Sequence, residues 1–136
     1  MSEENVEIVR RVYDAVDRGD TATVLALYDP EIEWEFARSP FRNMFKHDTY
    51  RGRDGLRDFI RERYEDAWER IEDELEQLID AGEQVISIIR TRGRGRASGI
   101  EVEKTHGGVW TVQNGAITRV EWMSHTDALE AAGLSE

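Results

Sequence analysis

A fifteen-residue segment near the C-terminus, VWTVQNGAITRVEWM at residues 109–123, constrains the fold more than any other part of the chain. Apolar residues alternate with polar ones on both sides of Asn114-Gly115, and this pattern is the strongest short signal for a β-hairpin. One tryptophan lies in each strand, at Trp110 and Trp122. The segment therefore predicts two paired strands that carry unusually large side chains.

The length of the turn decides which of these side chains share a face of the sheet. A two-residue turn places Trp110 opposite Arg119 and on the face away from Trp122. A three-residue turn over residues 113–115 pairs Val112 with Ala116, and we prefer it because it gathers the largest side chains. One face then carries Trp110, Val120 and Trp122, and the other carries Val109, Ile117 and Met123.

A sheet that is apolar on both faces must be covered twice. Exposed apolar strands invite aggregation, so each face is expected to find a partner. We expect helices around a cavity to cover the face that carries the tryptophans. We expect a second subunit to cover the face of Val109, Ile117 and Met123.

The composition limits the class of protein. A chain of 136 residues fits one domain with a real core, here residues 1–136. Its net charge of -11 disfavours a nucleic-acid partner. No stretch is apolar enough to span a membrane, and the polar start MSEENVEIVRR is unlike a signal peptide. The absence of cysteine fits a cytoplasmic location and excludes cysteine-based zinc sites.

The first half of the chain reads mainly as helix. Apolar residues recur at helical spacing from Ser2 until Gly19 ends the run. Asp20 begins a second, short helix that Pro30 closes, and a strand over residues 31–36 follows. Residues 37–51 show no period and predict a long loop. The clearest apolar stripe then predicts a third helix over residues 54–68.

The second half of the chain reads mainly as strand. Residues 69–80 are ambiguous, because their composition favours helix while Leu75, Gln77 and Ile79 alternate. Residues 84–91 and 100–112 are clear strands, and the run RGRGR at 92–96 predicts a loop between them. A short helix over residues 126–132 ends the chain. Helices followed by consecutive strands indicate an α+β fold.

Several motifs in this order resemble one family. They are VDRGD, ALYDPEIEW, YRGRDGLRDFI, IDAGEQVISIIRTRGRGRASG and the hairpin continued as SHTDALEAAGL. Together they resemble the SnoaL-like family of the nuclear transport factor 2 superfamily over essentially the whole chain. The resemblance implies a cystatin-like cone, in which a curved antiparallel sheet wraps around three helices as an α+β barrel with an internal pocket. It also implies a strand at 71–80 and a homodimer formed through the outer face of the sheet.

The superfamily contains acid–base enzymes, including ketosteroid isomerase, polyketide cyclases, limonene-epoxide hydrolase and scytalone dehydratase. The position that matches the isomerase base is Glu35, but its two oxyanion positions correspond to Val12 and Gly108. An enolate needs donors where its charge develops, so the isomerase reaction loses most of its support. For the epoxide hydrolase the candidates are Glu35, Arg90 or Arg92, and Glu121 or Glu103. Strand alternation turns the last two away from the pocket.

Three histidines complete the candidate groups. His106 shares a face with Trp110 and is either a base or a hydrogen-bonded core residue. His47 lies in the long loop beside Tyr50, and His125 begins the last helix. None of them has metal-ligand spacing, so we expect no metal and no cofactor.

The resulting hypothesis is a SnoaL-like protein that binds a hydrophobic or polycyclic small molecule in its cone. An acid–base enzyme of the isomerase, cyclase or epoxide hydrolase type is the alternative, with Glu35 and His106 as candidate catalytic residues. A non-catalytic interaction module is the second alternative. The expected pocket residues are Tyr13, Trp34, His47, Tyr50, Trp68, Arg90, Trp110, Val120 and Trp122.

Overall fold

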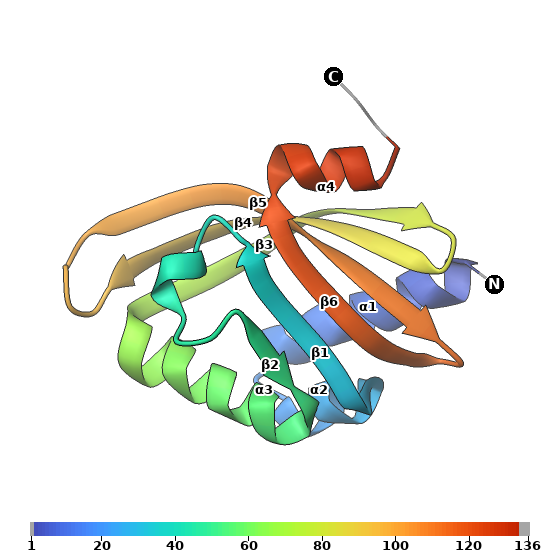
Figure 1. Ribbon diagram of the computed structural model, residues 1–136, viewed down its shortest axis with the longest axis horizontal. Helices are drawn as coiled ribbons and strands as arrows, with labels where there is room; N and C mark the ends of the chain where they lie inside the picture. The colour runs from blue at the N-terminus through green and yellow to red at the C-terminus, as the bar shows by residue number, and fades with distance from the viewer. Residues whose placement is uncertain (1, 134–136) are drawn as a thin grey trace.

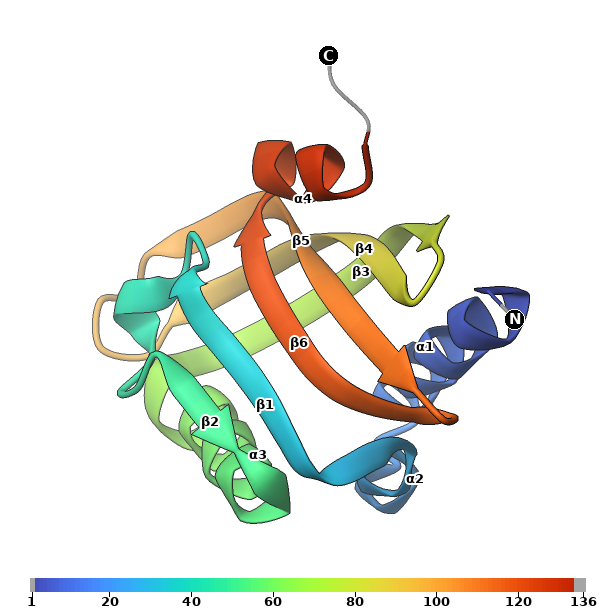
Figure 2. The same ribbon diagram turned by 45° about the vertical axis from the view of Figure 1, so that its right-hand side comes forward.

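The computed structural model describes residues 2–133. A six-stranded sheet bends around three helices, and a fourth helix lies on its opposite face (Figures 1 and 2). The helices are α1 (Ser2–Asp17), α2 (Thr21–Leu27), α3 (Gly52–Arg61) and α4 (His125–Ala131), with a 3-10 turn η1 (Arg42–Met44) and a π-helical turn η2 (Glu62–Ala67). The strands are β1 (Tyr28–Arg38), β2 (Thr49–Arg51), β3 (Trp68–Ala81), β4 (Gln84–Gly95), β5 (Glu101–Gln113) and β6 (Ala116–Ser124).

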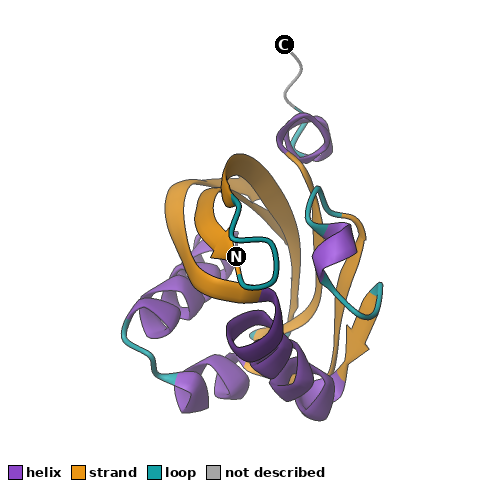
Figure 3. Cartoon of the chain, turned by 90° about the vertical axis from the view of Figure 1, so that its left-hand side faces the viewer, coloured by secondary structure: helices purple, strands orange, loops and turns teal. Residues whose placement is uncertain are grey.

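The sheet has the order β2-β1-β6-β5-β4-β3 and is not closed into a barrel. The expected α+β cone is confirmed, with a strong curvature over α1, α2 and α3 (Figure 3). The sheet is mixed rather than antiparallel throughout, because β1 runs parallel to β6, with Trp34 beside Val120. These two strands are far apart in the sequence. No tight turn forces them to run in opposite directions.

Local signals place the first two helices, although α2 ends at Leu27 and not at Pro30, which lies in β1. In α1, Val9 and Val12 are buried against the sheet, and the helix ends before Gly19, whose φ is 69°. The Asp20 carboxylate caps α2 by accepting a hydrogen bond from the backbone N–H of Thr23 at 3.1 Å. The first helical layer thus follows from spacing and capping alone.

The third helix is shorter than its apolar stripe predicts. α3 ends at Arg61, continues as the π-helical turn η2, and Trp68 is already the first residue of β3. The ambiguous segment that follows is a strand. It pairs with β4 along its whole length, from Trp68 beside Gly95 to Ala81 beside Gln84. Pairing with a buried neighbour overrides the helical propensity of this segment.

The prediction of a loop at RGRGR is wrong, because β4 continues to Gly95. Its arginines pair with acids on the neighbouring strands, as Arg92 does with Glu74 and Glu103. Gly93 makes room for an indole instead of forming a turn. A Cβ atom at this position would lie 2.8 Å from the ring of Trp68. The alternating glycines and arginines of this segment therefore allow close packing on one face of β4 and form ion pairs on the other.

The hairpin has a two-residue turn, so the predicted three-residue turn is wrong. Asn114 and Gly115 have φ values of 52° and 80°, and Val112 pairs with Ile117. A bulge next to Thr118 then shifts the register and brings Trp110 beside Val120. Because of this bulge, Trp110, Val120 and Trp122 share the inner face as predicted. Ile117 packs in the inner core with Val112, which contradicts its predicted outward position.

The outer face of the hairpin is covered by α4 of the same chain. Val109 and Met123 are buried in a second apolar cluster with Ala128 of α4. The approach is close, since a Cβ atom at Gly107 would lie 2.4 Å from the Cβ atom of Ala128. Helix α4 of the same chain therefore covers the outer apolar face of the hairpin. None of the helices between residues 2 and 133 combines the length and the apolar character needed to cross a bilayer.

Candidate functional site: an aromatic cavity with a polar end

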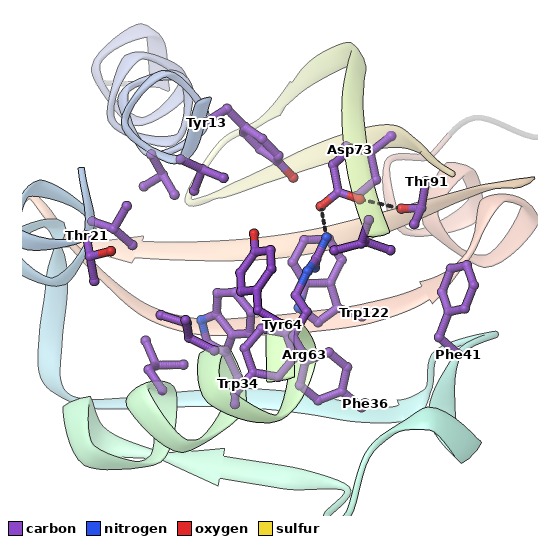
Figure 4. A pocket seen from close by; sticks show the side chains of 18 of the residues that line it. Tyr13, Thr21, Trp34, Phe36, Phe41, Arg63, Tyr64, Asp73, Thr91 and Trp122 are labelled. Carbon is purple, nitrogen blue, oxygen red and sulfur yellow. Dashed lines mark hydrogen bonds and ion pairs between the residues drawn. The ribbon is translucent and has the colours of Figure 1, made fainter. Parts of the chain in front are cut away.

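The concave face of the sheet and the helices enclose a cavity of about 350 Å³. Aromatic rings form much of its wall (Figure 4). Trp122 stands edge-on to both Trp34 and Trp110, with ring centroids 5.7 Å apart in each pair. Trp34 also contacts Phe59 of α3, at 4.9 Å between centroids. These rings pack against one another and form a rigid, apolar wall of the cavity.

One buried hydroxyl ties α1 to the sheet beside this cavity. Ser87 of β4 is fully buried, and its Oγ accepts hydrogen bonds from the Tyr13 hydroxyl and from Trp110 Nε1, both at 2.9 Å. Burial raises the pKa of Tyr13 above its usual value, so its hydroxyl keeps its proton and remains a donor. The bond fixes the orientation of the Trp110 indole in the cavity wall.

A chain of polar side chains forms one end of the cavity. Arg63 of η2 pairs with Asp73 of β3, with 2.7 Å between Nη2 and Oδ2. The other Asp73 oxygen accepts a hydrogen bond from Thr91 Oγ1 at 2.6 Å, and both interactions are drawn in Figure 4. Thr91 Oγ1 also lies 2.7 Å from His106 Nε2. Four residues from η2, β3, β4 and β5 thus form one continuous series of contacts.

His106 is a neutral imidazole at neutral pH. Its side chain lines the cavity and is buried against the rings of Phe41 and Trp122. Burial lowers its pKa from the usual 6.5 to about 4, since the apolar surroundings disfavour the charged ring more than Asp73 favours it. The ring therefore offers one N–H donor and one lone pair.

Three buried polar atoms of residues that line the cavity have no hydrogen-bond partner among the described residues. They are Trp122 Nε1, Arg63 Nε and His106 Nδ1. Leaving such buried groups unpaired costs roughly 1–3 kcal/mol each, and native proteins rarely tolerate it without a reason.

The polar end is built for hydrogen bonding, and its residues do not form a metal site. Within residues 2–133, no three histidine, aspartate or glutamate side chains converge to hold a metal ion. Both Asp73 oxygens already accept from neighbours, and one His106 nitrogen is occupied by Thr91.

Six of the residues expected at the site do line this cavity. Their common feature is an aromatic ring on the inner face of a strand or on a helix that faces the sheet. They are Tyr13, Trp34, Trp68, His106, Trp110 and Trp122. Val120 is fully buried in the core between them but is not among the lining residues.

Four other expected residues lie outside the cavity lining. The Glu35 carboxylate forms an ion pair with Arg119, on the face of β1 opposite Trp34, and this position does not support a base in the cavity. The remaining three also have their own partners. Arg90 pairs with Glu76 at 2.8 Å, His47 is exposed and stacks edge-on at 5.6 Å with Tyr50, and buried Tyr50 donates to Glu62 at 2.6 Å.

Of the polar end, only His106 was predicted from the sequence, although weak signals for Arg63 and Asp73 exist. Arg63 occupies a position that continues the apolar stripe of Phe59 and Ile60 in α3. Asp73 stands between Ile71 and Leu75 at strand spacing, where an apolar residue is typical. A charged residue at an inward-facing position is a sign of a buried pair, but neither position alone identifies its partner.

Comparison with known proteins identifies the family. A model of the SnoaL-like domain matches residues 9–120. An NTF2-like protein of Burkholderia thailandensis is 32% identical, with 94% of this chain and 95% of that chain covered and a TM-score of 0.76. An NTF2-like protein of unknown function from Burkholderia pseudomallei is 24% identical, with 96% of each chain covered and a TM-score of 0.76.

The fold is also shared with TerC, whose structure was determined after co-crystallisation with polyporic acid. TerC is 19% identical, with 95% of this chain and 97% of that chain covered and a TM-score of 0.75. No curated protein gave a significant match. The domain match spans most of the chain and agrees with the cone-shaped fold, so this chain belongs to the SnoaL-like family of NTF2-like proteins.

Proposed function

We propose that this protein binds a hydrophobic, polycyclic small molecule in the cavity. The observation that carries the proposal is a largely apolar cavity of about 350 Å³ that is lined by aromatic rings and by the polar side chains of Arg63, Asp73, Thr91 and His106. Its volume falls in the range of roughly 300–1,000 Å³ that is usual for ligand sites. The co-crystallisation of TerC with polyporic acid supports small-molecule binding by a protein of this fold.

The exposed lining residues indicate where such a ligand would enter. Val16 near the end of α1 and Tyr64 in η2 both line the cavity, yet 44% and 49% of their surfaces are exposed. They mark an opening between α1 and η2. An apolar molecule could pass there and stack on the indoles while its polar groups reach Arg63 and His106.

Filling the cavity should abolish binding of an aromatic probe. Ile60 is partly buried and lines the cavity, so Ile60→Trp should occupy ligand volume and weaken the binding of 2-naphthol at least about tenfold. Equilibrium dialysis measures the dissociation constant directly. Ile100→Trp is the matched control, because Ile100 is 64% exposed and lies outside the cavity lining.

Two results would count against the proposal. If the unmodified protein binds neither 2-naphthol nor larger aromatic probes, the proposal is refuted. Equal affinity in the Ile60→Trp and Ile100→Trp proteins would place binding elsewhere on the molecule. The open cavity also favours ligand binding over an interaction module with a filled core.

An acid–base enzyme is the second candidate, and the chain from Asp73 through Thr91 to His106 favours it. It ranks second because an imidazole with a pKa of about 4 is a weak base. If the protein is such an enzyme, it should accelerate exchange of the α-protons of 2-tetralone with D₂O, measured by NMR. His106→Phe should abolish the acceleration and leave 2-tetralone binding largely intact. An unchanged exchange rate in that variant would exclude His106 as the base.

Self-association through the predicted surface is not part of this proposal. Val109 and Met123 are already buried beneath α4, and Ile117 belongs to the inner core. A partner subunit at this place would have to contact α4 instead of the strands.

A further inference from the structure

Contacts on both sides hold the backbone of the π-helical turn η2 in place. Glu62, its first residue, is buried and accepts a hydrogen bond from the Tyr50 hydroxyl at 2.6 Å. Arg96, which follows β4, donates from Nη2 to the backbone oxygens of Tyr64 and Trp68, at 3.0 and 2.9 Å. An arginine that binds the last carbonyls of a helical segment stabilises its end. These contacts restrain the turn itself, so its side chains are the parts that are free to move.

Arg63 is the side chain of η2 that bridges this turn to the sheet. Its Nη2 atom lies 2.7 Å from Asp73 Oδ2 of β3 (Figure 4). The two side chains are 18% and 19% exposed, which places the ion pair at the boundary between the interior and solvent. An ion pair that water reaches contributes little net free energy, because water can replace each partner. Thermal motion can therefore break this contact.

The ion pair lies where the aromatic cavity meets a second space. A polar depression of about 420 Å³ lies on the other side, lined by charged residues of α1, β3 and β4. Tyr13, Asp17 and Asp73 line both spaces, so these residues separate them. Asp17 follows Val16, which marks the proposed entrance. The bond between Arg63 and Asp73 is therefore beside the route that a ligand would take.

A second position for the Arg63 guanidinium is available close by. Its Cζ atom lies 5.6 Å from the centroid of the Tyr64 ring, and 49% of Tyr64 is exposed. A guanidinium that leaves Asp73 can stack on the outer part of this ring. Arg63 Nε is buried without a hydrogen-bond partner among residues 2–133, and an outward position would give this donor access to water. Both effects offset part of the cost of breaking the ion pair.

We propose that the Arg63 side chain is a gate of the cavity, closed when it pairs with Asp73 and open when it turns outward onto Tyr64. This inference rests on the proposed function and adds the step that controls ligand entry and release. The closed gate slows both processes, since a ligand must wait for the ion pair to break in either direction. Affinity is unaffected, because the pair is closed in the free and in the ligand-bound protein alike.

Stopped-flow fluorescence with 2-naphthol measures the two rate constants separately. Arg63→Met removes the guanidinium and keeps an unbranched side chain. We expect its association and dissociation rate constants to rise by the same factor, about threefold to tenfold, while the dissociation constant stays within about twofold of that of the unmodified protein. Arg61→Met is the matched control, because Arg61 is exposed and pairs with Asp58 inside α3. Its rate constants should equal those of the unmodified protein.

Salt provides a readout that a loss of stability alone would not change. 2-Naphthol is uncharged at neutral pH, so screening acts on the gate and not on the encounter with the ligand. Association with the unmodified protein should be faster in about 0.5 M than in about 0.05 M sodium chloride, and Arg63→Met should lose this dependence. Asp73→Asn removes the ion pair from the other side and keeps an oxygen for Thr91. It should show the same acceleration, so the test remains decisive if Arg63→Met does not fold.

The outcomes separate the gate from the proposed function. If no aromatic probe binds the unmodified protein, the proposed function and the gate are both refuted. If 2-naphthol binds and associates at the same rate in the unmodified, Arg63→Met and Asp73→Asn proteins, the gate is refuted and the proposed function stands. A rise in the dissociation rate constant alone would identify Arg63 as a ligand contact, and this result also refutes the gate.

Discussion

Replacement of Trp110 by alanine should lower the free energy of unfolding by about 3–5 kcal/mol, the usual cost of deleting a buried large aromatic ring. Trp110 is 1% exposed and touches rings from α1, β1 and β6. Its centroid lies 5.6 Å from Tyr13, 6.5 Å from Tyr28 and 5.7 Å from Trp122. Deleting it removes contacts with both layers of the fold at once. Urea unfolding followed by circular dichroism measures the effect.

Trp110→Phe is the matched control, because it keeps a ring in the same place and removes the indole N–H. It leaves Ser87 with the Tyr13 hydroxyl as its donor. The hydrogen bond contributes about 1 kcal/mol, so this variant should retain most of the stability. A cost below about 1 kcal/mol for the alanine variant would mean that these rings do not form a rigid core.

Much of the fold follows from signals within a few residues of each other. The apolar spacing of α1, the Asp20 cap and the Asn114-Gly115 turn each predict their element correctly. The errors arise where a distant partner decides the outcome. β3 is a strand because β4 pairs with it, and the register of the hairpin depends on a bulge beside Thr118 that no turn motif predicts.

The candidate site also has one part that local sequence signals predict and one part that depends on distant residues. Its aromatic half could be predicted because strand alternation places Trp34, Trp110 and Trp122 on one face. Its polar end could not, because Arg63 and Asp73 come from different elements and acquire meaning only as a pair. Each position by itself gives only a weak sign of burial and does not identify its partner.

The case of Glu35 shows the limit of a resemblance. Its sequence position matches a catalytic acid of a related enzyme, but its neighbours Trp34 and Phe36 take the inner face of β1. Alternation then turns Glu35 outward, where Arg119 pairs with it and where the pKa of the Arg119 guanidinium is raised by that carboxylate. An alignment matches a residue to a position in the chain of a related enzyme. The alternation of side chains along the strand decides whether that residue faces the cavity or solvent.

Acidification should destabilise the unmodified protein more than the His106→Phe variant. Burial holds the pKa of His106 at about 4 in the folded state, against about 6.5 in the unfolded chain. Between pH 4 and pH 6.5, His106 is therefore mostly protonated in the unfolded chain and mostly neutral in the folded protein. The contribution of the neutral ring is therefore complete above pH 6.5 and is lost as the pH falls from 6.5 towards 4.

The slope of this loss is at most about 1.4 kcal/mol per pH unit, so the difference between the two proteins should change by about 2 kcal/mol from pH 7 to pH 5. Urea unfolding at both pH values, for both proteins, gives this difference. All other ionisable groups are the same in the two proteins, so their contributions cancel in the comparison. Phenylalanine keeps a ring against Phe41 and Trp122 and cannot titrate. Parallel pH dependence in the two proteins would mean that His106 is accessible to protons in the folded state.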